Sequence, residues 1–252
     1  MRRRFPILLA LTAQIAAAAL LMMTFALGAA WFEVKPSLYA TAAAQGMLAA
    51  ALGHLLGLSR WWLLINFAFV PSLIALIAFK IPTWGYLVGF LLLLLLNWNT
   101  FAGGVPLYLT GEGTRKKLEE ILDARSPTFR FIDLGSGLAG TLCQLSQRYP
   151  QAHFEGVETA PLVFLASWVR CLFRKNCRVR YRSLWRVDLS KYDIVYCFLS
   201  PVPMPELWKK ARAEMNGKSL LVSNTFEIPG IAPTQVIEMK DWRDSKILVW
   251  EL

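Results

Sequence analysis

The sequence predicts an α/β protein in two parts, a helical membrane anchor followed by a domain built on a mostly parallel seven-stranded sheet whose last strand is antiparallel. Two observations carry this prediction. Residues 1–111 contain 7 charged side chains, whereas residues 112–252 contain 37. The second part also alternates short apolar runs with amphipathic segments, the pattern of right-handed crossovers that cover a parallel sheet with helices on both faces.

The composition restricts the class of protein. With 56% hydrophobic and 17% charged residues, the chain is neither disordered nor a single soluble globule. The net charge of +10 divides evenly between the two parts, so basicity alone does not mark a nucleic-acid-binding domain. The four cysteines show no CxxC spacing and the two histidines, His54 and His153, lie far apart. We therefore expect free, reduced thiols and no metal site.

Four segments are long and apolar enough to cross a bilayer, which needs about 20 such residues. They form an expected anchor over residues 1–104, with spans at 6–30, 38–58, 61–79 and 81–101. The second segment contains Gln45 and His54, so an interfacial position is its alternative. A cleaved signal peptide is disfavoured, because the first apolar stretch is far longer than the usual apolar region of about 7–15 residues.

Basic residues at both ends of the anchor predict its orientation. Arg2–Arg4 precede the first span and Arg115–Lys117 follow the last, so the positive-inside rule places both ends in the cytoplasm. An even number of spans satisfies both ends. No ionisable pair lies within a span, which favours an anchor over a transporter.

The elements of the second part follow from its periodicity. Residues 114–124 place apolar side chains at helical spacing among charges, and 129–133 is a buried strand stopped by a glycine-rich turn. Further strands are expected at 152–157, 177–181, 194–199, 219–224, 235–239 and 246–250. Helices are expected between them at 138–149, 161–174 and 206–215, the first of these ended by Pro150.

The turn after the first of these strands contains the residues expected to bind a ligand. Gly135 and Gly137 permit a tight turn that brings a ligand close to backbone amides at the start of a helix. Glu158 ends the second strand, 23 residues after Gly135, where its carboxylate can accept both hydroxyls of a ribose. This arrangement suits an adenosine cofactor.

Two adenosine cofactors compete for this turn. Gly135, Gly137 and Gly140 satisfy the GxGxxG pattern of dinucleotide sites. Asp133 would oppose a pyrophosphate but can organise the positively charged amino-acid end of S-adenosylmethionine. We also expect no second catalytic domain that would bring a hydride acceptor to a nicotinamide. S-adenosylmethionine is therefore favoured over NAD, and a turn without any ligand is less favoured than either.

The stretch Phe131–Gly137 resembles motif I of class I S-adenosylmethionine-dependent methyltransferases, which have a Rossmann-like fold. Asn176–Asp193 and Val195–Pro201 are similar to a narrower group, the membrane-anchored lysine methyltransferases of mitochondria that modify the adenine nucleotide translocase and the ATP synthase c subunit, with their bacterial relatives. Val105–Thr110 resembles the pre-motif of that group. The resemblance covers roughly residues 105–230 and implies a methyltransferase domain over residues 105–252.

The resemblance implies roles for matching residues. The methionine end of the donor would be held by Asp133, Gly135, Ser136 and Gly137, the ribose by Glu158, and the adenine between Ser183 and Leu184. Ser200 and Pro201 would line the methyl-transfer site. A neutral lysine amine could be oriented by the hydroxyl of Ser200 or Tyr108, or by the amide of Asn224. Leu138 and Ala139 depart from the family, which usually has an acid and then a glycine there.

We therefore expect a bacterial, multi-pass inner-membrane enzyme with a cytoplasmic catalytic domain that methylates a lysine of a membrane protein. A lipid or quinone-like acceptor is the alternative, and a non-catalytic donor-binding scaffold is a third hypothesis.

Seven cations follow one another without an acid between them, and none of them has a role in the expected donor or methyl-transfer site. They are Arg170, Arg174, Lys175, Arg178, Arg180, Arg182 and Arg186. This run could be a solvated face, an anchor to anionic lipid, or a substrate or nucleic-acid groove. Trp168 and Phe173 beside it favour membrane contact among the binding roles. Nucleic acid is disfavoured as a partner, because the tether holds the domain at the bilayer and no aromatic platform accompanies the charges.

Overall fold

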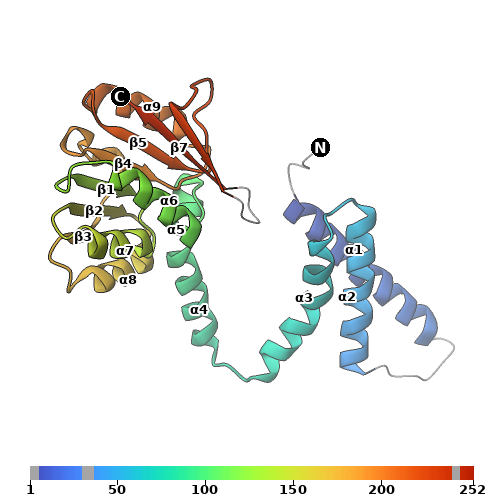
Figure 1. Ribbon diagram of the computed structural model, residues 1–252. Coiled ribbons are helices and arrows are strands. Elements are labelled where there is room, and N and C mark those ends of the chain that lie inside the picture. The colour runs from blue at the N-terminus through green and yellow to red at the C-terminus, as the bar shows by residue number, and fades with distance from the viewer. Residues whose placement is uncertain (1–5, 30–36, 240–244) are drawn as a thin grey trace. The chain divides into compact units, whose positions relative to one another are not determined.

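The computed structural model describes residues 6–29, 37–239 and 245–252, and the chain divides into two compact units, residues 1–87 and 88–252 (Figure 1). The basic residues Arg2–Arg4 lie outside the described part. The division falls inside α4 (Thr83–Leu96), earlier than the domain boundary expected after residue 104. The second unit therefore includes α5 (Trp98–Gly103), whose Asn99 donates a hydrogen bond to Glu158.

The first unit contains α1 (Pro6–Ala29), α2 (Leu38–Leu55), α3 (Trp61–Ala78) and the beginning of α4. Among the described residues, two helices are long and apolar enough to span a membrane, α1 over Pro6–Leu27 and α3. The apolar stretch expected to span at 81–101 is interrupted at Asn97, which separates α4 from α5. At 1.5 Å per residue, the 14 residues of α4 extend about 21 Å, less than the hydrocarbon thickness of about 30 Å.

Amide side chains join the first three helices. The Gln14 Nε2 donates to the Asn66 backbone oxygen at 2.9 Å, and the Gln45 Nε2 donates to the Gln14 Oε1 at 2.9 Å. Gln45 is buried. The sequence analysis used Gln45 as an argument that this segment lies in the membrane interface. Beside Gln45, a Cβ at Gly46 would lie 2.3 Å from the Phe67 backbone oxygen. Small residues and interhelical amide bonds of this kind hold apolar helices together where hydrophobic contact alone cannot.

The second unit is a three-layer α/β domain. Its sheet has the order β3-β2-β1-β4-β5-β7-β6, in which only the pairings made by β7 are antiparallel. The strands are β1 (Arg130–Leu134), β2 (His153–Glu158), β3 (Cys177–Tyr181), β4 (Ile194–Cys197), β5 (Leu220–Asn224), β6 (Gln235–Glu238) and β7 (Lys246–Glu251). The predicted fold class is confirmed, and every strand end lies within two residues of its expected position.

Helices cover both faces of the sheet (Figure 1). One face packs against α6 (Glu112–Asp123), α7 (Gly140–Arg148) and α8 (Pro161–Cys171), whose apolar residues join a buried cluster around Phe131. The other face packs against α9 (Met204–Glu214) and two 3₁₀ turns, at Leu184–Arg186 and Leu189–Lys191. Burial on both faces explains why the central strands read as continuous apolar runs.

The topology brings distant parts of the chain to one edge of the sheet. β1 pairs in parallel with β2 on one side and with β4 on the other, so Leu134 lies opposite both Val157 and Cys197. The crossovers on either side of β1 run in opposite directions along the sheet. This switch point leaves a crevice at the carboxyl ends of the strands, the usual ligand site of such folds.

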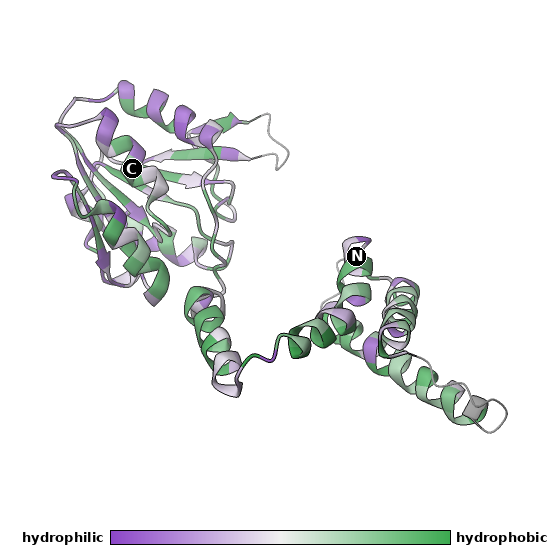
Figure 2. Ribbon diagram, turned by 90° about the horizontal axis from the view of Figure 1, so that it is seen from below, coloured by the Kyte–Doolittle hydropathy of each residue, from purple (hydrophilic) through white to green (hydrophobic). Residues whose placement is uncertain are grey.

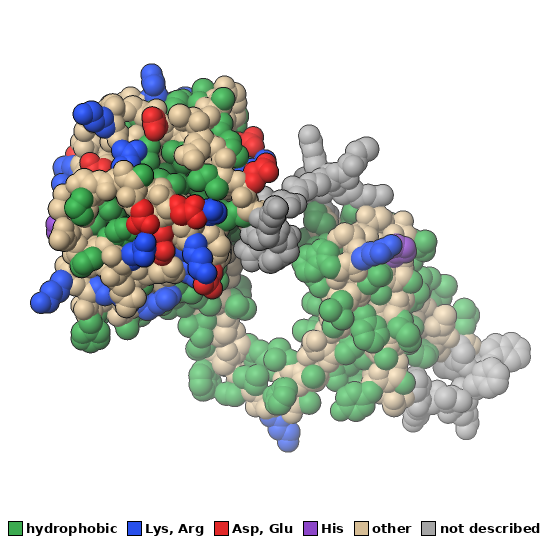
Figure 3. All heavy atoms as spheres, viewed as in Figure 1, with side chains coloured by type: hydrophobic (Ala, Val, Ile, Leu, Met, Phe, Trp, Pro, Cys, Tyr) green, Lys and Arg blue, Asp and Glu red, His purple; other side chains and the backbone are tan. Residues whose placement is uncertain are grey.

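The two units differ in surface chemistry. The helices of the first unit consist mostly of hydrophobic residues, whereas the elements of the second unit mix hydrophobic and hydrophilic residues (Figure 2). The space-filling view shows acidic and basic side chains gathered over the second unit (Figure 3). The contrast agrees with the uneven distribution of charge along the sequence.

We expect Gly46→Ala to destabilise the first unit, because its Cβ would meet a backbone oxygen of α3 that cannot move as a side chain can. Thermal unfolding in detergent micelles would measure a loss of about 1–3 kcal/mol. Gly89→Ala is the matched control, since nothing lies within 4 Å of its added Cβ. Equal melting temperatures for the two variants would contradict close packing of α2 on α3.

Candidate functional site

The glycine turn connects the end of β1 to α7. Gly135 and Gly137 have φ values of +85° and +52°, a region that side chains with a Cβ rarely adopt. The amides of Gly135 and Ser136 both donate to the Val157 carbonyl at 3.0 Å. Ser136 Oγ is buried and has no partner in the described part of the chain. The turn therefore presents a hydroxyl without a hydrogen-bond partner, beside a backbone that a ligand can approach closely.

Ala139 occupies the position where the resemblance implies a glycine. It has φ +55° and is the N-cap residue of α7. A left-handed conformation costs an alanine about 1–2 kcal/mol, which explains the preference for glycine. The turn nevertheless forms with alanine, so this departure from the family pattern does not prevent the glycine turn from adopting its shape.

Asp133 lies at the floor of the crevice, on β1. Its side chain is 4% exposed, and no described residue donates a hydrogen bond to it. Burial, reinforced by the nearby charge of Glu158, raises the pKa of Asp133 to about 8. An uncompensated buried carboxyl of this kind favours a cationic ligand, because a positive group placed beside it would stabilise its ionised form.

Glu158 ends β2 and is hydrogen-bonded on both oxygens. Its Oε2 accepts from the Gly137 amide at 3.0 Å, and its Oε1 accepts from the amides of Thr159 and Ala160 at 2.7 and 2.9 Å. The Asn99 Nδ2 donates to the same Oε1 at 2.6 Å. The carboxylate expected to bind ribose thus also ties the glycine turn to the start of α8.

Asn99 is a site residue that the sequence analysis missed. Besides donating to Glu158, its Oδ1 accepts from the Thr159 hydroxyl at 2.6 Å. Asn97 and Asn99 are polar interruptions at the end of a long apolar run, and this was the available signal. It was passed over because residues 81–101 were interpreted as one span.

Two cavities open at the carboxyl edge of the sheet. The larger, of about 550 Å³, includes Glu158, Ser183 and Leu184 in its lining. The smaller, of about 310 Å³, includes Asp133 and Ser136. Residues expected to bind adenosine therefore line one cavity, and residues expected to bind an amino-acid end line the other.

Tyr108 borders both cavities, as Gly135 and Phe198 also do. Its ring stacks on Phe198 at a centroid distance of 4.9 Å and contacts Phe226 at 5.4 Å. A Cβ at Gly137 would lie 3.1 Å from the neighbouring Leu107 side chain. The pre-motif therefore packs directly over the glycine turn and ends in a small aromatic cluster at the junction of the cavities.

The other residues expected to act on the substrate lie away from these cavities. Ser200 is buried and Pro201 exposed, and neither lines either cavity. Asn224 is 1% exposed and donates to the Tyr196 hydroxyl at 3.2 Å. That hydroxyl is also 2.9 Å from the Thr110 hydroxyl. Asn224 therefore reaches the smaller cavity only through Tyr196, which lines it.

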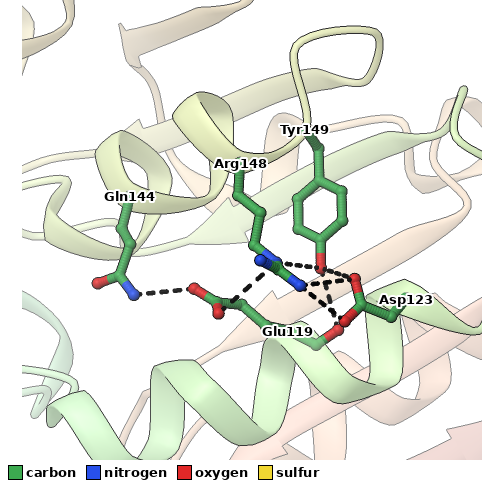
Figure 4. Close-up of polar contacts among 5 residues, drawn as sticks. All are labelled: Glu119, Asp123, Gln144, Arg148 and Tyr149. Atoms are coloured by element: carbon green, nitrogen blue, oxygen red, sulfur yellow. Dashed lines mark hydrogen bonds and ion pairs between the residues drawn. The ribbon is translucent and has the colours of Figure 1, made fainter.

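A polar network fixes α6 against α7 (Figure 4). The Arg148 Nη2 lies 3.0 Å from the Asp123 Oδ2, and the Tyr149 hydroxyl donates to the Asp123 Oδ1 at 2.7 Å. Gln144 Nε2 donates to Glu119 Oε1 at 2.8 Å. The hydrogen bonds from Tyr149 and Arg148 lower the pKa of Asp123, so this carboxyl is ionised at neutral pH. The network sets the position of α6 relative to the glycine turn.

Arg115, on the first turns of α6, is the second missed residue. It lines the smaller cavity, and its Nη1 is so close to α7 that a Cβ at Gly140 would be 3.4 Å away. Its Nε is buried without a partner in the described residues. The sequence analysis used Arg115 only to predict the orientation of the membrane anchor. The smaller cavity is thus lined by the Asp133 carboxyl and by the guanidiniums of Arg115 and Arg170. A carboxyl and a guanidinium together can bind both charges of an amino-acid end.

Comparison with known proteins agrees with this geometry. Residues 133–235 match the model of the ANTKMT methyltransferase domain. Among curated protein sequences no relative was found. An RNA methyltransferase from Salinibacter ruber, solved with S-adenosyl-L-homocysteine, has 19% identity and a TM-score of 0.52, covering 57% of this chain and 93% of its own.

Two further solved structures are less similar. The tRNA methyltransferase TrmK of B. subtilis has 15% identity and a TM-score of 0.46, with 54% of this chain and 65% of its own covered. A mutant of MtNAS in complex with S-adenosylmethionine has 16% identity and a TM-score of 0.45, with 54% and 60% covered.

The match of residues 133–235 to a methyltransferase domain sets aside NAD as the cofactor and a non-catalytic scaffold as the role. The buried acid on β1, the glycine turn and the acid on β2 fit S-adenosylmethionine, which is the cofactor. Residues 133–235 carry an ANTKMT methyltransferase domain, and the chain is a class I S-adenosylmethionine-dependent methyltransferase.

Proposed function

We propose that the protein is a protein-lysine N-methyltransferase of a bacterial inner membrane, with several membrane-spanning helices in residues 1–104, a cytoplasmic catalytic domain over residues 105–252, and a membrane protein as its acceptor. One observation supports a membrane tether for the catalytic domain. The apolar helix α4 ends at Leu96, and Asn99, three residues later, is hydrogen-bonded to Glu158. A bilayer that contains α4 would therefore hold the cofactor cavity at its surface.

The cofactor would lie across both cavities. Its ammonium group would approach Asp133 and its carboxylate would approach Arg115, both in the smaller cavity. Its ribose would approach Glu158, with the adenine beside Ser183 and Leu184 in the larger cavity. The sulfonium would then lie near the junction of the cavities. Two guanidiniums, those of Arg115 and Arg170, line the smaller cavity with the Asp133 carboxyl. Arg170 donates to the Leu138 carbonyl, whereas the buried Arg115 Nε has no partner among the described residues, so this placement uses Arg115.

Bound S-adenosylmethionine supplies the methyl group, in an in-line displacement that forms a nitrogen–carbon bond as the carbon–sulfur bond breaks. The lysine amine must first lose a proton to solvent, because its unperturbed pKa is about 10.4. Tyr108, which borders both cavities, would orient this amine. The stacked rings of Tyr108 and Phe198 would form an aromatic wall for a methylated ammonium. Ser200 and Asn224 would act as positioning residues, since neither lines a cavity.

A lipid or quinone-like acceptor is the second candidate. The observation that favours it is the apolar character of the larger cavity, whose lining includes Val105, Leu184, Leu199 and Val202. A hydrophobic acceptor could enter there from a bilayer. The match to the ANTKMT domain favours lysine over this alternative.

Radiolabelled methyl transfer into membranes that contain the full-length enzyme decides between these acceptors. We expect the label in protein, and acid hydrolysis should release it as methyllysine. An Asp133→Ala variant is the control and should transfer at least tenfold less label. Label that partitions into extracted lipid would refute the lysine acceptor and support the alternative.

The affinity for S-adenosylmethionine should rise with pH. Below about 8 the buried Asp133 carboxyl keeps its proton, so binding of an ammonium group must expel it. The apparent affinity should therefore increase towards pH 8 and then level. Calorimetry in buffers of different ionisation enthalpy would count the released protons. Asp133→Asn should abolish this release, leaving only the titration of the ligand itself, and an unchanged proton count would contradict the assignment.

Replacing Arg115 should weaken cofactor binding without unfolding the domain. Arg115→Met keeps the aliphatic stem and removes the proposed carboxylate contact, so we expect roughly tenfold weaker binding, the usual value of a hydrogen bond to a charged group. Lys116→Met is the matched control, because Lys116 lies on the same helix turn but is exposed in a pair with Glu112. Equal dissociation constants for the two variants would contradict the role of Arg115.

A further inference from the structure

The helix α8 is apolar on two sides. Its inner side buries Val163 and Cys171 against the sheet. On the outer side, five large apolar residues are exposed at spacings of three and one, continuing through the turn after the helix. This outer stripe of α8 consists of Leu165, Trp168, Val169, Leu172 and Phe173. Phe173 is 92% exposed. An aligned apolar stripe on a soluble surface indicates a contact surface, because solitary exposed apolar residues are common but continuous stripes are not.

Cations flank the outer stripe. Four of the seven cations in this region form neither an ion pair nor a side-chain hydrogen bond with the described residues: Arg174, Lys175, Arg182 and Arg186. Arg178 and Arg180 differ, because both are bound to Glu155 at 2.7 Å. Arg170 donates to the Leu138 carbonyl. The four unpaired cations leave a net positive surface beside the stripe, which complements an anionic partner.

The stripe is connected to both the membrane-proximal helix and the active site. Thr159, which precedes the N-cap residue of α8, donates its hydroxyl to Asn99 of α5. At the other side, Phe164 of α8 contacts Tyr181 at the end of β3, with ring centroids 5.3 Å apart. Arg182, the next residue, lines the larger cavity together with Trp185. Contacts made by α8 and by the residue before its N-cap therefore reach both α5 and the segment that lines the larger cavity.

We propose that the outer stripe of α8 and its four flanking cations lie on the anionic headgroup layer of a lipid bilayer. An apolar stripe bordered by Lys and Arg is the arrangement of helices that lie in the plane of a membrane interface. Aliphatic residues and a tryptophan then enter the headgroup region while the cations contact lipid phosphates. Nucleic acid is a poorer match, since an aligned aliphatic stripe offers neither stacking nor hydrogen bonds to bases.

The proposed contact gives the tether a function that a flexible anchor would lack. It rests on the proposed membrane location, and adds that the domain has one fixed face towards the lipid. With α8 against the headgroups, the larger cavity would open at the interface, where a lysine of a membrane protein emerges from the bilayer. Access of soluble proteins to the cavity would be reduced.

Depth-dependent quenching of a site-specific fluorophore tests this orientation. The full-length enzyme is reconstituted into nanodiscs rich in phosphatidylglycerol, and a bimane is attached to Phe173→Cys. The native cysteines are all buried, so the introduced thiol is labelled selectively. The matched control is Lys209→Cys on α9, an exposed position across the sheet from α8. Lipids with a nitroxide on the acyl chain near the headgroup serve as quenchers.

We expect about threefold stronger quenching at position 173 than at position 209. Nanodiscs of phosphatidylcholine alone, and the charge reversals Arg174→Glu with Lys175→Glu, should reduce the difference. Equal quenching at both positions, in enzyme that stays in the nanodiscs, would overturn the contact and leave the tether intact. Protection from aqueous iodide by added RNA without lipid quenching would also overturn it.

Enzyme that fails to remain in the nanodiscs would instead refute the membrane tether. The same quenching measured with added anionic vesicles then decides the role of α8 separately. Quenching confined to position 173 would support the lipid contact, and its absence would overturn it.

Discussion

The carboxylate of Glu158 is the interaction on which the organisation of the site depends. It accepts hydrogen bonds from the glycine turn through Gly137, from the first residues of the α8 segment through Thr159 and Ala160, and from the segment that follows the apolar helices through Asn99. A buried carboxylate needs such donors, because an unpaired one would be neutralised by its desolvation cost. One side chain thus satisfies its own burial by joining three parts of the chain.

The two acids of the crevice are stabilised differently, and this difference gives the site its chemistry. Glu158 is surrounded by donors, whereas no described residue donates to Asp133, and burial raises the pKa of Asp133 to about 8. A cationic ligand would stabilise the ionised form of Asp133, whereas Glu158 already has hydrogen-bond donors. Arg115, whose buried Nε has no partner in the described chain, is the opposite charge for the other end of an amino-acid group. The polar network between α6 and α7 keeps that arginine beside the turn.

The active site, the chain entering the domain and the outer stripe of α8 are neighbours for the same reason. Asn99 and Thr159 are 60 residues apart and bonded side chain to side chain, so whatever holds α5 also holds the start of α8. In this arrangement a membrane tether would not be a loose attachment. It would define which face of the domain meets the lipid, and with it which acceptors can reach the junction marked by Tyr108.

The sequence by itself determined the parts that depend on local patterns. Short apolar runs located the strands, helical spacings located the helices, the glycines around Ser136 located the turn, and the charge distribution separated the two units. Only the tertiary structure decided which side chains reach the cavities, because that depends on contacts between residues far apart in the chain. It shows that Asn99 is hydrogen-bonded to Glu158 and that Arg115 lines the smaller cavity, whereas Ser200 and Asn224 line neither cavity. Periodicity records which face of an element is buried, but not what lies across the crevice from it.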